Sequence, residues 1–265
     1  MRLAWVTDIH LNFLDAAQVQ AFCAALRERQ PDAVLVGGDI AEADTVEWYL
    51  KILAADVQRP IYFVLGNHDF YQGSIPAVRK VMDGLCRVES RLTYLAQAGC
   101  IALTPTTGLV GHDGWGDGQW GDYANSTVRL NDHRLIRELT GLDRGELRTR
   151  LKRLGDEAAE YLRSVLPLAL DAHERVILLT HVPPFVEACW HEGKTADDNW
   201  APFFTCKAVG DVLLDVMGKR VDRQLTVLCG HSHGAGTAQV LPNLTVLTGR
   251  AEYGAPEIQR LFDIP

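Results

Sequence analysis

The sequence at residues 64–71 reads Val-Leu-Gly-Asn-His-Asp-Phe-Tyr and completes an apolar run that begins at Ile61. The run is typical of a buried strand, and a glycine ends it. The amide of Asn67, the imidazole of His68 and the carboxylate of Asp69 follow at once. Open α/β sheets bind ligands in the crevice at the carboxyl ends of their strands, so we expect a functional turn here. Taken alone, the Gly-Asn-His-Asp tetrapeptide is equally compatible with a turn whose side chains are solvated.

Two earlier segments repeat this pattern of an apolar strand followed by polar side chains. Residues 3–7 precede Asp8-Ile9-His10, and residues 33–36 precede a Gly-Gly pair and Asp39. A stretch with helical periodicity follows each strand. Three strand–turn–helix units predict parallel strands with right-handed crossovers, so the three polar turns are expected at one edge of a sheet. The predicted helices cover about residues 15–29, with Asp15 as the N-cap, 44–55 and 74–87.

The rest of the chain predicts short strands, two more helices and two irregular segments. A long charged helix is expected over residues 143–172, with Gly155 and Pro167 as kinks or breaks. Residues 111–135 and 183–206 contain no regular pattern. We see no internal repeat and no linker, so a single domain over residues 1–265 is predicted. The other predicted elements are strands at 92–95, 100–103, 107–110, 175–180, 225–229, 237–241 and 244–247, and a helix at 207–219. The first three of these strands either extend the first sheet or start a second one.

Composition excludes several classes of protein. The 265 residues are 47% hydrophobic and carry a formal charge of −8. A negative surface argues against broad binding to nucleic acid, which requires a cationic face. The N-terminal residues turn polar too soon for a signal peptide, and no apolar run is long enough for a membrane span. The six cysteines form no Cys-x-x-Cys pair, so we expect reduced thiols in a cytoplasmic protein. They are Cys23, Cys86, Cys100, Cys189, Cys206 and Cys229.

The polar residues at the predicted strand ends form a candidate metal site. Carboxylate, imidazole and amide ligands without thiolate suit Mn, Fe, Zn or Mg. Seven ligands exceed what one ion needs, but they suffice for two ions if one carboxylate bridges them. A pair of metal ions is a known solution for in-line displacement at phosphorus. The seven candidates are Asp8, His10, Asp39, Asn67, His181, His231 and His233.

This site predicts a phosphoester hydrolase without a covalent intermediate. Two metal ions neutralise phosphate oxygens and activate a bridging water as the attacking hydroxide. The leaving alkoxide then needs a proton, and His68 stands beside Asn67, in a position to donate it. Asp69 is expected to hold the ring of His68 by a hydrogen bond and to raise its basicity.

Five motifs resemble those of the calcineurin-like metallophosphoesterase family and occur in the same order. They are Asp8-x-His10, Gly38-Asp39, Gly66-Asn67-His68-Asp69, His181 and Gly230-His231-x-His233. The resemblance implies an α/β fold in which an α-β-β-α sandwich of two mixed sheets is flanked by helices. It implies that one metal is bound by Asp8, His10, Asp39 and His233. It implies that the second is bound by Asp39 as the bridge, Asn67, His181 and His231. His68 matches the family's general acid or transition-state donor.

Departures from the branches of this family narrow the expected substrate. Gly38-Asp39 is followed by Ile40-Ala41-Glu42, without the Val-Asp-Arg-Gly that resembles protein Ser/Thr phosphatases. His68 replaces the Arg found in the lipid-A-pathway pyrophosphatases. Cyclic-nucleotide-type phosphodiesterases and small-molecule phosphatases both share Asn-His-Asp, so a small phosphomonoester or phosphodiester is expected. The alternative is a binding protein that uses the same fold as a scaffold, in which case metal ligands should be missing.

Substrate choice is expected in the two irregular segments, which contain four of the six tryptophans. An aromatic wall that stacks on a base or encloses a leaving group is one interpretation. The other is that each ring pins a long loop to the body of the protein. The four are Trp115, Trp120, Trp190 and Trp200. The spacing of Asp113, Asp117 and Asp122 fits no calcium-binding loop, and nothing distinguishes Arg129, Arg134 and Arg250 from surface arginines.

Overall fold

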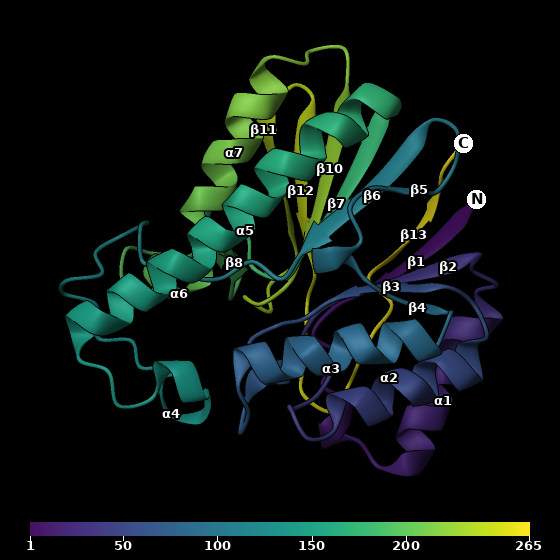
Figure 1. The fold of residues 1–265 in the computed structure, drawn as a ribbon, viewed down its shortest axis with the longest axis horizontal. Coiled ribbons are helices and arrows are strands. Elements are labelled where there is room, and N and C mark those ends of the chain that lie inside the picture. The colour runs from purple at the N-terminus through teal and green to yellow at the C-terminus, as the bar shows by residue number, and fades with distance from the viewer.

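Two β-sheets lie face to face in the computed structural model, which describes residues 1–265 (Figure 1). The first has the strand order β13-β1-β2-β3-β4, in which β1 to β4 are parallel and β13 is antiparallel to β1. The parallel arrangement of the first three strands is as predicted. The bounds are β1 Arg2–Val6, β2 Ala33–Gly37, β3 Ile61–Val64, β4 Leu92–Tyr94 and β13 Arg260–Asp263.

The second sheet has the order β11-β12-β10-β7-β6-β5, with parallel strands at its centre and antiparallel strands at both edges. The three short strands predicted over residues 92–110 are therefore divided between the sheets. A separate hairpin joins β8 Trp190–His191 to β9 Lys194–Thr195. The bounds in the second sheet are β5 Ile101–Ala102, β6 Thr107–His112, β7 Arg175–Thr180, β10 Gln224–Cys229, β11 Gly236–Leu241 and β12 Leu244–Thr248.

Helices cover the outer face of each sheet, so the layers run α-β-β-α as expected (Figure 1). Asp15 begins α1 and Asp143 begins α5, each through a capping box with the residue three positions later. The helices are α1 Ala16–Glu28, α2 Val46–Val57 and α3 Ile75–Val88 on the first sheet, and α5 Arg144–Ala172 and α7 Lys207–Gly218 on the second; α4 Asp132–Leu135 and α6 Ala201–Phe204 are short. None of them combines the length and apolar character that crossing a membrane requires.

Alternating side chains of the strands build three apolar cores. In β1, Leu3 and Trp5 face the second sheet, whereas Ala4 and Val6 face the helices, as the two-residue period of a strand dictates. The core between the sheets also contains Leu179 of β7. Because both sheets pack through this core, the carboxyl ends of β1, β2, β3, β7 and β10 open toward one region.

Two elements differ from those expected from the sequence. The long helix α5 continues without a break through Gly155 and Pro167. The strand β13 was not expected, because its four residues show no buried run and owe their conformation to pairing with β1.

Candidate metal centre

The structure brings all seven predicted metal ligands together at the carboxyl ends of strands from both sheets. Four of them follow β1, β2 and β3 of the first sheet, and three follow β7 and β10 of the second. Six of the seven side chains are almost fully buried, and His233 is the most exposed. The strand that carries His233 lies next to the strand that carries His181, so residues far apart in sequence form one cluster.

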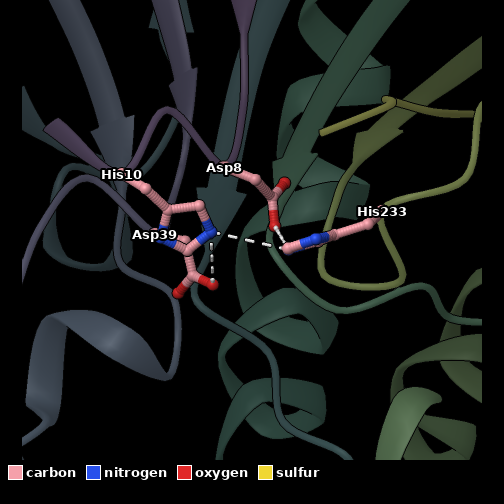
Figure 2. Close-up of side chains that lie close together, drawn as sticks. All are labelled: Asp8, His10, Asp39 and His233. Carbon is pink, nitrogen blue, oxygen red and sulfur yellow. Dashed lines mark hydrogen bonds and ion pairs between the residues drawn. The ribbon is translucent and has the colours of Figure 1, made fainter. Parts of the chain in front are cut away.

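Asp8, His10, Asp39 and His233 form the first half of this cluster (Figure 2). One ligand atom from each lies within 4.8 Å of the others. The Nε2 atom of His233 is 3.4 Å from Asp8 Oδ1 and 3.5 Å from His10 Nε2. Carboxylate oxygens and imidazole nitrogens converge on one point, which is the donor set that a hard or borderline divalent cation prefers.

Asn67, His181 and His231 form the second half, and their hydrogen bonds define their tautomers. The Nδ1 atom of His181 lies 2.9 Å from the carbonyl of Gly37, and Nε2 of His231 lies 3.1 Å from the carbonyl of Phe203. A carbonyl only accepts, so each of these nitrogens carries the proton. The other nitrogen of each ring carries a lone pair. Nε2 of His181 lies 3.2 Å from Asn67 Oδ1, and Nδ1 of His231 lies 3.0 Å from the same oxygen. Three acceptors thus face one another without a donor, which is the arrangement a cation would satisfy.

Asp39 joins the two halves. Its Oδ1 atom lies 3.4 Å from Nε2 of His181, and its Oδ2 atom lies 3.8 Å from Nε2 of His10. Oδ1 also accepts a hydrogen bond of 2.9 Å from the amide of His68. One oxygen therefore faces each half, which suits a bridging carboxylate.

Two residues outside the predicted set orient Asn67. Its Nδ2 atom donates to Asp132 at 2.8 Å and to the hydroxyl of Tyr71 at 3.2 Å, and Tyr71 donates to the same Asp132 oxygen at 2.7 Å. With Nδ2 held on this side, Oδ1 of Asn67 must face the histidines. Asp132 lies in the irregular segment 111–135, 65 positions after Asn67 in the sequence. No local sequence pattern indicates its role.

Asp113 ties together the strands that carry the second half of the cluster. Its side chain accepts a 2.9 Å bond from the amide of Leu65, directly before the Gly-Asn-His-Asp turn. Its backbone carbonyl accepts a 3.0 Å bond from the amide of His181. The guanidinium of Arg79 neutralises the buried carboxylate and donates a hydrogen bond to it, and the hydroxyl of Tyr94 donates another. Asp113, Asp117 and Asp122 have separate partners, which agrees with the absence of a calcium-loop spacing.

The backbone around the cluster is held in an uncommon conformation. Five of the seven ligands have positive φ values between 40° and 67°: Asp8, His10, Asp39, His231 and His233. Glycines allow the close approach that follows, because a Cβ on Gly66 would overlap Asp39 Oδ1 and one on Gly230 would overlap Asp8 Oδ2. Such strain persists where the surroundings over-determine it, and it gathers at functional sites.

The prediction that Asp69 holds the ring of His68 by a hydrogen bond is wrong. Both oxygens of Asp69 accept from backbone amides, at 2.9 Å from Ile40 and from Ala41 and at 2.8 Å from Gly66. Asp69 is fully buried, and it fastens the loop after β2 to the loop after β3. The ring of His68 instead stacks on Tyr71 at 4.2 Å between centroids.

Burial suppresses the ionisation of three imidazoles at the site, those of His10, His231 and His68. It lowers the pKa of His10 and of His231 to about 3. Burial and then the neighbouring His181 lower the pKa of His68 to about 4. These rings are neutral at pH 7, so their lone pairs are free to bind a metal.

The two carboxylates of the first half shift in opposite directions. Burial and the charge of Asp8 raise the pKa of Asp39 well above its usual range. Burial opposes ionisation of Asp8 too, but its pKa is lowered, and the hydrogen bond with His233 is the largest of the interactions that lower it. Neighbouring buried carboxylates do not both ionise without a cation. The residues therefore fit metal ions.

A cavity of about 300 Å³ opens beside the cluster. Arg129 is the sole arginine or lysine that lines it, and His68 and Phe204 also face it. Arg250 instead pairs with Glu257 at 2.8 Å. Tyr253, which the sequence did not single out, covers the cluster from the C-terminal segment with its ring 4.6 Å from that of His10.

The tryptophans of the irregular segments differ in role. Trp115 is buried and packs on Phe70 with ring centroids 5.8 Å apart, as the loop-pinning interpretation expects. Trp190 lies against Gly236, and Trp120 lies under Lys207. Trp200 is 39% exposed and lines a separate, smaller cavity of about 150 Å³.

Comparisons with known sequences match the chain to a family model and to a bacterial protein. A family model described as calcineurin-like phosphoesterase matches residues 1–235. A protein of Pseudoalteromonas sp. (strain SM9913), named probable cyclic nucleotide phosphodiesterase PSM_A2567, is 32% identical over 82 residues, which are 26% of this chain and 31% of that protein. The chain thus spans less than a third of that relative.

Solved structures resemble the whole chain. The phosphopantetheinyl hydrolase (PptH) of Mycobacterium tuberculosis has a TM-score of 0.68 and 16% identity, over 95% of this chain and 89% of that one. A dimetal phosphatase from Danio rerio has a TM-score of 0.58 and 16% identity, over 94% and 87% of the two chains. At these identities the likeness concerns the fold, and it confirms the predicted fold class.

Proposed function

The chain belongs to the calcineurin-like phosphoesterase family, and from this premise we propose that it is a dinuclear metal-dependent hydrolase of a small phosphoester. The observation that carries the proposal is the orientation of Asp39, which presents one oxygen to each set of ligands. No ligand of either set is missing, and this argues against a scaffold that has lost its chemistry. One ion would be held by Asp8, His10, Asp39 and His233, and the other by Asp39, Asn67, His181 and His231.

The side chains around the cluster then have defined tasks. When bound, the ions would supply positive charge to the phosphate and lower the pKa of water at the site. His68 lies beside the cavity, and its Nε2 is 3.9 Å from Asp39 Oδ2. Because its imidazole is neutral at pH 7, we assign it the donation of one N–H hydrogen bond to the leaving oxygen as charge develops there. Asp69 acts through the backbone, by fixing the turn that carries Asn67 and His68.

The cavity supports an anionic substrate of small size. Arg129 supplies a permanent positive charge on the wall of a cavity of about 300 Å³. Such a space accommodates a small organic phosphate, whereas a nucleic acid would require a broader cationic surface. The name of the bacterial relative suggests cyclic nucleotides as one group of candidates.

Metal analysis followed by a substrate panel tests this function. Protein purified without chelator should contain two metal equivalents, and it should hydrolyse members of a panel of phosphomonoesters, phosphodiesters and cyclic nucleotides in the presence of Mn²⁺. Removal of the metal should abolish turnover, and Mn²⁺ should restore it. A protein that binds fewer than two ions at saturating Mn²⁺, or hydrolyses no phosphoester, would refute the proposal.

The role of His68 predicts a dependence on the leaving group. His68→Ala should slow turnover of alkyl esters by roughly 10²–10⁴-fold, because the alkoxide loses its donor. The loss should shrink for nitrophenyl esters, whose leaving group is stable without one. His173→Ala, at the amino end of β7 and away from the site, is the matched control. Equal losses for both kinds of ester would contradict the donor role.

A further inference from the structure

A second cavity, of about 150 Å³, adjoins the cavity at the metal centre. The two share His191 and Phe204 as lining residues. Trp200 and Thr195 line the second cavity only. All four residues belong to the irregular segment 183–206, and none of them is a proposed metal ligand. The cavity is thus a compartment added beside the site.

Aromatic rings connect this compartment to the metal centre. The ring of Phe204 lies 4.6 Å from that of the ligand His231 and 5.3 Å from that of Trp200, to which it is nearly perpendicular at 69°. The ring of His191 lies 6.1 Å from that of Trp200. Only one ring separates the compartment from a metal ligand, so a group bound here and a phosphate at the metals can belong to one small molecule.

The walls of the compartment are fixed by hydrogen bonds. Asp197 accepts a 3.1 Å bond from the amide of Trp200, which anchors the residue that carries the exposed indole. The Nδ1 atom of His191 lies 3.0 Å from the carbonyl of Ser232, so it carries the proton and Nε2 is an acceptor. A rigid aromatic face beside an acceptor suits a flat ring that carries a hydrogen-bond donor.

The charges of the compartment exclude an anionic ring. Glu192 and Asp197 line it together with one ammonium group, that of Lys194. Two carboxylates against one cation leave a net negative charge, in contrast to the arginine beside the metal centre. The phosphate end and the compartment therefore prefer groups of different charge.

We propose that this compartment binds a planar, uncharged ring in the organic part of the phosphoester, stacked on Trp200 with its edge toward Phe204. The inference rests on the proposed hydrolase function, and it specifies the substrate class as phosphoesters that carry such a ring. Stacking of a base on an aromatic side chain contributes a preference of roughly 5- to 150-fold.

The test compares two esters that differ only in the ring. Adenosine 5′-methylphosphate carries a neutral base with an amino donor, and the matching O-methyl riboside carries none. The wild type should show a kcat/KM roughly 5- to 150-fold higher for the adenosine ester. Trp200→Ala should remove this preference by raising KM for the adenosine ester, so that the two esters have similar kcat/KM values. Trp48→Ala, an indole 55% exposed on α2, is the matched control and should retain the preference.

Binding of adenosine alone supplies a readout that needs no turnover. Calorimetry on metal-free protein should detect adenosine binding to the wild type and to Trp200→Phe, which keeps a ring, but not to Trp200→Ala. Hydrolysis of both esters at equal kcat/KM, without adenosine binding, would overturn the ring site and leave the hydrolase function intact. Adenosine binding with hydrolysis of neither ester, and of no other member of the phosphoester panel, would overturn the hydrolase function and still support the ring site.

Discussion

At the residue scale, the backbone of the proposed ligands shows what the site costs the fold. Five of them adopt left-handed φ values that favour glycine, although none is a glycine. Each such residue costs about 1–3 kcal/mol unless the surroundings compensate. The chemistry of the side chains, rather than the stability of the turns, therefore explains the residue types at these positions.

This strain predicts an unusual order of stability at His233, whose φ is 59°. In metal-free protein, His233→Gly should be more stable than His233→Ala by roughly 1–2 kcal/mol, because alanine retains the Cβ that disfavours this conformation. Denaturant unfolding measures the difference. Leu214 lies inside α7 and is 40% exposed. There the order should reverse, and Leu214→Ala should be more stable than Leu214→Gly by about 1 kcal/mol. The same order at both positions would contradict the argument.

The orientation of Asn67 gives a second prediction at this scale. Asp132→Ala should weaken metal binding by roughly 10- to 100-fold, because Nδ2 of Asn67 loses its main acceptor. Asp132→Asn should retain most of the affinity, since its amide oxygen can accept the same two bonds. Titration of metal-free protein with Mn²⁺ measures both. Equal weakening by the two substitutions would show that the charge of Asp132, and not its acceptor atom, matters.

At the scale of elements, the sequence was most informative where a segment shows its own pattern. The apolar runs before Asp8 and Asp39 predicted buried parallel strands, and Asp15 predicted a helix start, because these signals are local. Strand β13 could not be predicted in this way, since its pairing partner lies at the other end of the chain. The reason for a glycine inside α5 was also missed, because Gly155 lies against Asp117 in a tertiary contact that no local pattern shows.

That contact predicts the effect of Gly155→Ala. Alanine favours a helix over glycine by about 1 kcal/mol, but its Cβ would lie 2.5 Å from that of Asp117. Asp117 is fully buried and accepts the amide of Ala208, so it cannot move aside freely. We expect a net loss of about 1–3 kcal/mol in the free energy of unfolding.

Gly84→Ala is the matched control, because Gly84 lies inside α3 and a Cβ there meets nothing within 4 Å. That substitution should stabilise the protein by roughly 0.5–1 kcal/mol. Thermal unfolding of the two variants provides the measurement. Stabilisation by both would mean that the segment before α4 adapts to the added methyl group.

At the scale of the whole molecule, the site exists only because the two sheets pack together. Asp8 follows a strand of the first sheet, and His231 follows a strand of the second; the amide of His231 donates a 2.9 Å bond to the Asp8 carboxylate. The order of the motifs predicted which residues would gather. It could not predict that Tyr253, Asp132 and Phe204 would enclose them, because irregular segments reach the site through contacts that no local pattern encodes.

Because ligands from both sheets would share the ions, metal binding should stabilise the folded chain by mass action. Above both dissociation constants, each bound ion adds about 1.4 kcal/mol to the free energy of unfolding for every tenfold rise in free metal. The slope of the free energy of unfolding against the logarithm of free metal therefore reports the number of bound ions. Two ions predict about 2.7 kcal/mol for each tenfold rise in free metal. Denaturant unfolding at several buffered Mn²⁺ concentrations measures this slope.

Variants separate a shared carboxylate from an ordinary ligand. His181→Ala should reduce the slope to that of one ion, about 1.4 kcal/mol per tenfold, since only the second half of the cluster loses a ligand. Asp39→Asn should reduce it toward zero, because the oxygens that face His10 and His181 belong to one carboxylate. His173→Ala should keep the wild-type slope. If Asp39→Asn kept the slope of one full ion, Asp39 would serve a single metal and the two halves of the cluster would be independent sites.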